Sequence, residues 1–202
     1  MKRPNKPLPC CGKGFTLTEL MVVIAISVVM IGFTYSGFSS WQRRERVRAA
    51  ANELASFMKY ARFQAIERNM SHVVDIDKDD ATFRVVRIDN LTAYDALPTP
   101  GTPIDNSTPG ITMLEDMEVD VARKYGNEVV FSDNTTTGEF PLCFGVRGLR
   151  VTIKAVVGGG RDTEYAKNDA VAGFSNADMT CNVVISPGGS TEVTCNDIYH
   201  SD

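Results

Sequence analysis

The residues with the clearest chemical meaning lie where a basic leader meets a long apolar run, and they read Lys13-Gly14-Phe15-Thr16-Leu17-Thr18-Glu19. No charged residue occurs from Leu20 to Gln42, a stretch long enough to cross a membrane. An ordinary secretory signal carries its small-residue cleavage site after the apolar core. Here the candidate cleavage site, the Gly14–Phe15 bond, precedes the core. Proteolysis at this bond would therefore remove the leader and leave the apolar helix attached to the chain.

Glu19 is the second candidate for chemistry, because its carboxylate is embedded near the start of the apolar run. A charged side chain at the centre of a bilayer costs about 2.5–3.5 kcal/mol on insertion scales, and such residues are usually functional. The alternative interpretation is a signal anchor with Glu19 among the lipid headgroups. That alternative explains neither Gly14 nor Phe15, so a functional carboxylate is favoured.

This order of parts, a Gly followed by Phe-Thr-Leu-x-Glu and an apolar run, resembles a type IV prepilin or pseudopilin. The resemblance implies that a prepilin peptidase recognises Gly14 at the cytoplasmic face of the bacterial inner membrane, and that Phe15 becomes the N-methylated first residue. It also implies that Glu19 pairs with the N-terminal amine of a neighbouring subunit. The chain would then cross the membrane once, with its N-terminus in the cytoplasm and its head in the periplasm.

Loss of the leader, residues 1–14, would also remove Cys10 and Cys11 and leave Cys143, Cys181 and Cys195. The segment from Cys181 to Cys195 has the pattern of a β-hairpin, and a turn centred on Gly188 places these two cysteines opposite each other. Facing positions on adjacent strands suit a disulfide, and an oxidising periplasm allows one. We therefore expect a Cys181–Cys195 bond. A bond from Cys143 to either cysteine is the alternative that the sequence leaves open.

The sequence suggests no metal site, no cofactor and no catalytic centre. The two histidines, His72 and His200, have no ligand-spaced Cys or His neighbours. The spacing Asp75-x-Asp77-x-Asp79 superficially resembles a calcium loop, but it lacks the glycine and the final glutamate of an EF-hand. These aspartates are therefore interpreted as turn carboxylates. No Ser/His/Asp order, Cys/His pair or phosphate loop stands out, which indicates a protein that is not an enzyme.

One long helix is predicted over residues 15–69, which contain no proline, with a membrane-spanning part at 15–38. Apolar or small residues then recur at helical spacing and predict an amphipathic half that packs on a sheet: Val47, Ala50, Ala51, Leu54, Phe57, Met58, Ala61 and Ala65. The weak helix-forming stretch from Gly32 to Gly37 predicts either local melting on assembly or an uninterrupted, closely packed helix. The basic run Arg43–Arg48 indicates a surface that faces lipid headgroups or, alternatively, docks another subunit.

Beyond residue 70 the pattern predicts an all-antiparallel β head over residues 70–202, and therefore an α+β fold with the long helix packed on this head. The predicted strands are His72–Asp77, Thr82–Asp89, Met117–Val121, Glu128–Ser132, Leu142–Val146, Leu149–Val156 and the two arms of the Cys181–Cys195 hairpin. Residues 90–110 contain four prolines and predict an exposed loop. Residues 158–180 are predicted to be a polar stretch with no assigned strand.

Three segments carry a second resemblance: Asn52-Glu53-Leu54-x6-Ala61-Arg62-x2-Ala65-Ile66-x-Arg68-Asn69, Glu128-Val129-Val130-Phe131-Ser132 and Val183-Val184-Ile185-Ser186-x2-Gly188. They are similar to the GspH/FimT family of minor pseudopilins. This resemblance implies a subunit that assembles through its N-terminal helix into a type II secretion pseudopilus or type IV pilus, at or near the tip, and supports protein secretion or pilus biogenesis. The implied partners are the prepilin peptidase, other major and minor pilins or pseudopilins, and the inner-membrane assembly platform.

The alternative function is that of a FimT-like DNA-uptake receptor. A DNA site of that kind would place arginines just after the last turn glycine, where this chain reads Gly189-Ser190-Thr191-Glu192-Val193. Removing the four basic leader residues from the 21 Lys+Arg leaves 17 against 25 Asp+Glu, a formal charge of −8. A net acidic head without those arginines attracts phosphates weakly, so nucleic acid is not the expected partner.

Overall fold

The structure is a computed structural model that describes residues 15–89, 104, 107, 109–132, 142–155 and 161–198, with only the backbone described at 33–37, 115–116, 152–155 and 161–165. The chain divides into two units between Ser40 and Trp41. The first unit contains the N-terminal part of a long helix. The second contains the remainder of that helix and every described strand.

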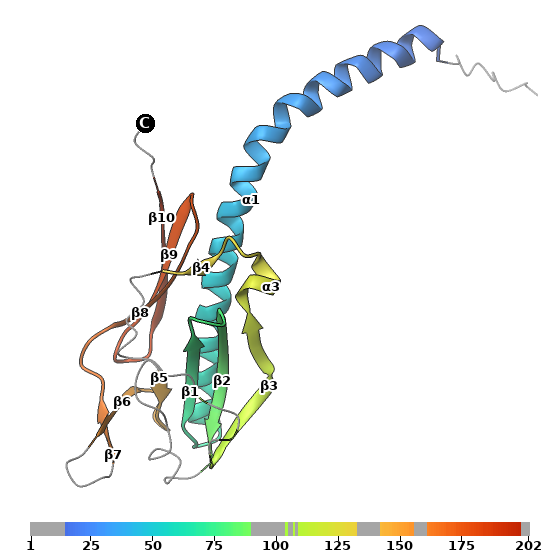
Figure 1. Ribbon diagram of the computed structural model, residues 1–202. Coiled ribbons are helices and arrows are strands. Elements are labelled where there is room, and N and C mark those ends of the chain that lie inside the picture. Colours follow the sequence, from blue (N-terminus) through green and yellow to red (C-terminus); the bar gives the residue numbers. More distant parts are fainter. Residues whose placement is uncertain are drawn as a thin grey trace, which may run out of the picture. The chain divides into compact units, whose positions relative to one another are not determined.

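Helix α1 spans Leu17–Glu67 and agrees with the predicted helix to within two residues at either end (Figure 1). The helix is continuous from Gly32 to Gly37, so in the single subunit this stretch forms the uninterrupted helix that was one of the two predictions. The helix ends soon after Gln64, whose carbonyl accepts the last backbone bond from Arg68. Asn69 then adopts a positive φ of 52° and turns the chain into the first strand.

The head consists of two antiparallel sheets. The larger has the strand order β3-β2-β1-β5-β6-β7 and the smaller the order β10-β9-β8-β4. The elements are β1 His72–Asp77, β2 Thr82–Ile88, β3 Ile111–Asp120, α3 Val121–Tyr125, β4 Val130–Phe131, β5 Leu142–Phe144, β6 Arg150–Ala155, β7 Arg161–Tyr165, β8 Ala170–Ser175, β9 Met179–Ile185 and β10 Thr191–Asp197. The predicted α+β class, a long helix with an antiparallel β head, is confirmed.

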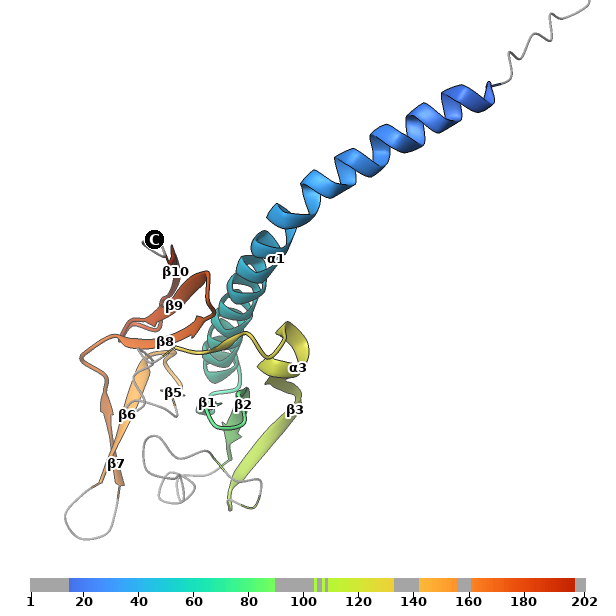
Figure 2. The ribbon, with the colours of Figure 1, turned by 45° about the horizontal axis from the view of Figure 1, so that its top comes forward.

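Small side chains let the second half of α1 approach both sheets closely. Four alanines on this face are fully buried: Ala50, Ala51, Ala61 and Ala65. They belong to one apolar core with Leu54 and Met58 of the helix, Phe144 of β5 and Ile185 of β9. The predicted amphipathic stripe is therefore the contact face, and Figure 2 shows the helix running beside strands of both sheets.

A series of aromatic rings connects the helix with the two sheets. Phe57 of α1 meets Phe83 of β2 edge to face, with ring centroids 5.1 Å apart. Phe83 lies 6.1 Å from Phe174 of β8, which in turn lies 4.7 Å from Phe131 of β4. Such pairs contribute roughly 0.5–1.5 kcal/mol each beyond the burial of their area. The rings therefore tie the larger sheet to the smaller one across the core.

A buried ion pair holds part of the segment that was predicted to be an exposed loop. Asp75 of β1 is 2% exposed, and its Oδ2 accepts from Arg84 Nε at 3.2 Å and from the backbone N–H of Ile104 at 3.0 Å. Burial raises the pKa of Asp75, and the Ile104 N–H and the Arg84 guanidinium oppose that rise. Ile104 itself is fully buried against a second apolar cluster, so the exposed-loop prediction is wrong at this position. Most of residues 90–110 lie outside the described residues.

The larger differences from the predicted strands lie at β3 and beyond residue 158. Strand β3 begins at Ile111, six residues before the predicted start, and Val121 opens a short helix because Asp120 Oδ1 caps the N–H of Arg123 at 2.9 Å. The polar stretch contains β7 and β8. Strand β8 was not predicted, because its buried side chains include the small residues Ala170 and Ala172, which do not give the hydrophobic pattern of a strand.

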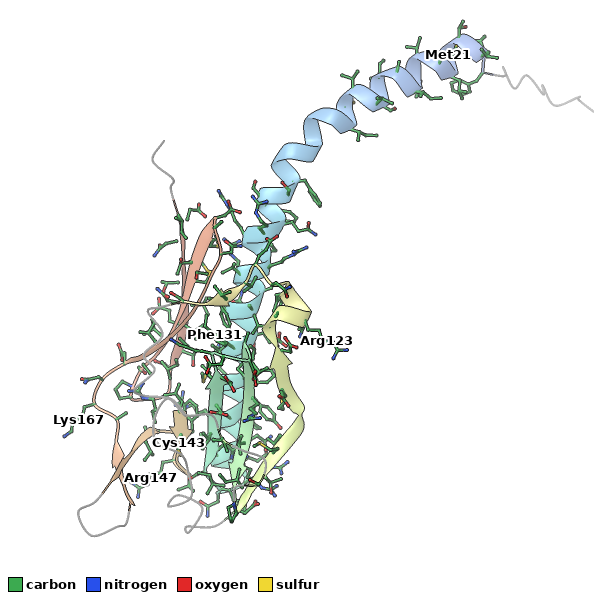
Figure 3. All side chains as sticks on the ribbon, in the orientation of Figure 1. Met21, Arg123, Phe131, Cys143, Arg147 and Lys167 are labelled. Atoms are coloured by element: carbon green, nitrogen blue, oxygen red, sulfur yellow. A yellow bond between two sulfur atoms is a disulfide. The ribbon has the colours of Figure 1, made fainter. Side chains whose placement is uncertain are left out.

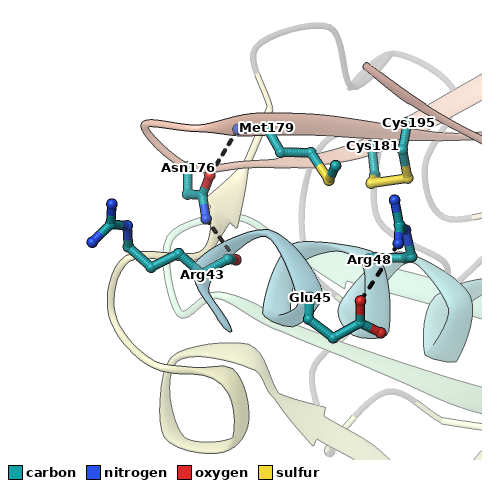
Figure 4. The surroundings of a disulfide bond; sticks show 7 residues. All are labelled: Arg43, Glu45, Arg48, Asn176, Met179, Cys181 and Cys195. Carbon is teal, nitrogen blue, oxygen red and sulfur yellow. Dashed lines mark hydrogen bonds and ion pairs between the residues drawn. A yellow bond between two sulfur atoms is a disulfide. The ribbon is translucent and has the colours of Figure 1, made fainter. Parts of the chain in front are cut away.

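Two arginines of the basic run contact the head of their own subunit, a role that neither predicted orientation of the run included. Arg43 Nε lies 2.6 Å from Asp178 Oδ2. The backbone carbonyl of Arg43 accepts from Asn176 Nδ2 at 2.8 Å (Figure 4). Arg44 Nη1 lies 3.6 Å from Asp197 Oδ2. The hydrogen bond to Asp178 raises the pKa of Arg43. Two of these arginines therefore bind carboxylates of their own subunit.

Arg62 forms a second attachment between α1 and two turns of the head. Its Nη1 donates to Gly189 O at 3.1 Å. A methyl group added at Gly148 would lie 2.5 Å from Ile66 Cδ1, and one at Gly189 would lie 2.6 Å from Gly148 O. Both glycines also have positive φ, 70° and 77°. The helix and the two turns meet too closely here for any side chain.

Gly189→Ala is expected to lower the free energy of unfolding by about 1–3 kcal/mol, because it forces a methyl group against Gly148 O at a left-handed backbone position. Gly188→Ala is the matched control, since the nearest atom to its methyl group would be Ser186 Oγ at 3.8 Å. Urea unfolding of the two variants measures the difference. Equal stability of both variants would contradict the close contact.

Candidate functional site

The start of α1 carries a reciprocal capping arrangement around Glu19. The carbonyl of Thr16 accepts the first helical bond from Leu20, which makes Thr16 the N-cap residue. Glu19 Oε2 accepts from the backbone N–H of Thr16 at 3.0 Å and from its hydroxyl at 2.9 Å. The N–H of Glu19 donates back to Thr16 Oγ1 at 3.3 Å. This is a capping box, and it fixes the Glu19 carboxylate at the positive end of the helix dipole.

Thr16 is a residue that motif reasoning overlooked, although the pattern Thr16-x-x-Glu19 before an apolar run is itself a signal for a capping box. Phe15, directly before the cap, is strongly exposed in the single chain. Gly14 lies outside the described residues, so the predicted cleavage site is described on one side only. Processing at this bond stays a prediction.

Apolar side chains project from all sides of the first part of α1 (Figure 3, near Met21). From Leu20 to Ile31 each large apolar side chain is more than half exposed in the single chain. A helix that is apolar all round is stable only when buried in lipid or among other helices. Among the residues whose side chains are described, no helical stretch qualifies as a membrane span by length and hydropathy. The span predicted at 15–38 includes residues 33–37, whose side chains are not described, and it stays a prediction.

The closing hairpin brings Cys181 of β9 opposite Cys195 of β10, and the two form a disulfide with Cα atoms 4.0 Å apart (Figure 4). The predicted pairing is confirmed. The alternative bond from Cys143 is wrong: that residue is fully buried on β5, in the second apolar cluster with Val73 and Ile104. The disulfide links the edge strand β10 to its neighbour β9 and fixes the hairpin register.

The candidate metal ligands have other roles in the described structure. Asp77 Oδ1 accepts from the N–H groups of Asp79 and Asp80 at 2.9 and 3.2 Å, which makes it a turn carboxylate as predicted. The same interpretation is wrong for Asp75, which is buried within β1 and accepts from Arg84 and from the Ile104 N–H. His72 is buried, its Nδ1 lies 3.0 Å from Met70 O, and burial lowers its pKa. His200 lies outside the described residues. Within the described part of the chain, no three His, Cys, Asp or Glu side chains are grouped as metal ligands.

The last turn glycine has a basic neighbour that the linear sequence does not place there. Residues 189–193 contain no arginine and carry the exposed Glu192. Yet Gly189 receives the hydrogen bond from Arg62, a helix residue 127 positions earlier. The Arg62 side chain donates to this backbone carbonyl and packs against Gly148 and Gly189, so it has a structural role within the subunit.

The chain matches the prokaryotic N-terminal methylation motif over residues 12–35. This motif, the long helix and the antiparallel head define a pilin-like protein of the prepilin class. Residues 50–159, more than half of the chain, match the family described as type II transport protein GspH. The chain therefore belongs to the GspH family of minor pseudopilins. Its motif is that of prepilin peptidase substrates anchored in the inner membrane, and as a pseudopilus component it is a structural subunit rather than an enzyme.

Two solved structures have a similar chain trace. The minor pseudopilin EpsH from the type 2 secretion system of Vibrio cholerae is 8% identical, with a TM-score of 0.47 over 74% of this chain and 96% of that one. The type IV minor pilin FimU of Pseudomonas aeruginosa is 13% identical, with a TM-score of 0.48 over 76% of this chain and 92% of that one. No curated protein sequence matches the chain.

In protein extracted from cells, non-reducing peptide mapping is expected to recover Cys181 linked to Cys195, with Cys143 outside the cross-link. Replacing both linked cysteines by serine is expected to lower the free energy of unfolding by about 3 kcal/mol, the typical effect of a loop this long. Cys143→Ala serves as the control that keeps the cross-link. A recovered peptide that joins Cys143 to either cysteine would contradict the arrangement.

Proposed function

We propose that this GspH-family chain is held in the inner membrane as a single-pass protein and is then inserted, at or near the tip, into the pseudopilus of a type II secretion system. Its N-terminus lies in the cytoplasm and its head in the periplasm. The match of residues 50–159 to a type II transport family supports secretion over pilus biogenesis. The inner-membrane assembly platform and the other pseudopilins are its partners in this proposal.

The observation that carries the proposal is the capped carboxylate of Glu19 at the start of a helix whose apolar side chains are exposed on all sides. Such a helix needs a lipid or helical environment. In that environment a carboxylate is strongly disfavoured unless it is paired. The hydrogen bonds from Thr16 go to Oε2, which leaves Oε1 to receive a cation.

Processing would supply that cation. Cleavage of the Gly14–Phe15 bond creates an amine one residue before the Thr16 cap. In an assembled filament the amine of one subunit would meet Glu19 of its neighbour, so that both charges are satisfied by one contact. The pairing sets the axial register between subunits, because any other register leaves a buried charge without a partner.

Cleavage is expected between Gly14 and Phe15, with a methylated Phe15, and intact-mass analysis of membrane-extracted protein checks it. Gly14→Val is expected to block the cleavage, because the residue before the cut must be small, whereas Gly12→Val serves as a control two residues away. Recovery of an uncleaved wild-type chain from cells with an active prepilin peptidase would reject this part of the proposal.

Glu19→Ala and Glu19→Gln are expected to insert into the membrane but to support secretion poorly. Removal of the charge makes insertion easier, so a defect must arise in subunit pairing. Thr18→Ala is the matched control, because it leaves the bonds between Thr16 and Glu19 in place. Secretion and pilus formation are both measured, which separates the two filament systems. Wild-type secretion in both Glu19 variants would count against the proposal. A defect confined to pilus formation would also count against it.

A further inference from the structure

The second half of α1 buries one face completely, but its opposite face exposes two large apolar side chains near the end of the helix. Phe63 is 59% exposed and Ile66 is 52% exposed. Lys59 precedes Phe63 by four residues and Ile66 follows it by three, so the three side chains share one helical face. Lys59 is exposed as well. This face belongs to the head unit and is separate from the apolar surface of residues 20–31.

The turn between β5 and β6 extends this surface. It is closed by backbone bonds from Gly148 N to Gly145 O at 2.8 Å and from Gly145 N to Leu149 O at 3.0 Å. Gly148 lies directly against Ile66, since a methyl group there would be 2.5 Å from Ile66 Cδ1. Val146, 43% exposed, and the exposed Arg147 directly precede Gly148 in this turn (Figure 3 labels Arg147).

Together Lys59, Phe63, Ile66, Val146 and Arg147 form what we name the basic–apolar patch. In the described part of the chain neither Lys59 nor Arg147 makes an ion pair. Arg43 and Arg44, which lie earlier on α1, each pair with a carboxylate of the head. Arg62 adds a third cation beside it, held by Gly189 O. Glu67 is the carboxylate next to the patch on α1, and the three cations outnumber it. The patch is thus apolar at its centre and positive at its margin.

We propose that the basic–apolar patch docks the head of another pilin-class subunit, through a surface that is apolar at its centre and acidic at its margin. The inference rests on the proposed function, because insertion into a filament places heads of different subunits side by side. An exposed apolar cluster with free cations is complementary to such a surface, and a head-to-head contact of this kind would desolvate Phe63 and Ile66.

A second copy of this chain fits the patch less well. A two-fold symmetric contact would bring Lys59 and Arg147 of one copy against the same cations of the other. A head-to-tail contact would need an acidic, apolar surface elsewhere on the head. The other exposed large apolar side chains of the described head are far apart in sequence: Trp41 on α1, Val130 on β4 and Ile198 directly after β10.

A photoreactive benzophenone amino acid in place of Phe63, in the full-length chain in cells that make the complete filament system, tests the docking. We expect a cross-link to the head of another pilin-class subunit, identified by mass, at a peptide that contains Asp or Glu. The double reversal Lys59→Glu with Arg147→Glu should reduce this cross-link by at least about tenfold. The charge-preserving pair Lys59→Arg with Arg147→Lys should retain it.

A cross-link to lipid, to nucleic acid or to a second copy alone would overturn the inference, as would no cross-link or one that ignores charge reversal. Formation of the Cys181–Cys195 disulfide in each variant verifies that the head is folded. The proposed function fails separately: it is rejected if Glu19 is dispensable for secretion. If secretion depends on Glu19 while Phe63 cross-links nothing, the docking inference alone is wrong.

Discussion

The contact between the small-residue face of α1 and the two sheets is the interaction on which the rest of the head depends. Ala50, Ala51, Ala61 and Ala65 bring the helix axis close to the strands, and the phenylalanines of β2, β5 and β8 fill the space between the sheets. A longer side chain at any of these four fully buried positions would overpack the core and is expected to be destabilising. The turns at Gly148 and Gly189 lie against Ile66 and Arg62 of the packed helix.

Charge is divided along α1 according to what each part of the helix contacts. At its start, Glu19 is held by the cap residue Thr16 within the same chain. At the beginning of the head unit, Arg43 and Arg44 bind Asp178 and Asp197 of the head. Each of these charged groups is therefore paired with a group of its own chain, although none of them is buried. Lys59 and Arg147 of the basic–apolar patch differ, because neither makes an ion pair within the described part of the chain.

The same principle explains the buried Asp75. An aspartate in a strand interior is costly unless its oxygens accept hydrogen bonds, and Arg84 and the N–H of Ile104 provide them. That pair anchors Ile104 over the outer face of the larger sheet, where Val73, Val86, Ile88 and Cys143 form a second core. Both faces of β1 are consequently covered, and Cys143 is sequestered from the disulfide hairpin.

The sequence by itself determined the features that depend on local periodicity and on neighbouring residues. The proline-free apolar and amphipathic stretch predicts α1, and the short apolar run that ends at a polar turn predicts β1. The Pro-Gly-Gly turn predicts the hairpin of β9 and β10 and sets the register that pairs Cys181 with Cys195. The prepilin pattern around Gly14 and Glu19 likewise needs only consecutive residues. Strand β8 was not predictable in this way, because alanine and glycine have little strand preference and become a buried strand only beneath a helix. Tertiary structure alone decided that Arg43 meets Asp178, that Arg62 reaches Gly189, and that Ile104 of a proline-rich segment is buried. These contacts join residues far apart in sequence, and their energies depend on a close approach that no local pattern encodes.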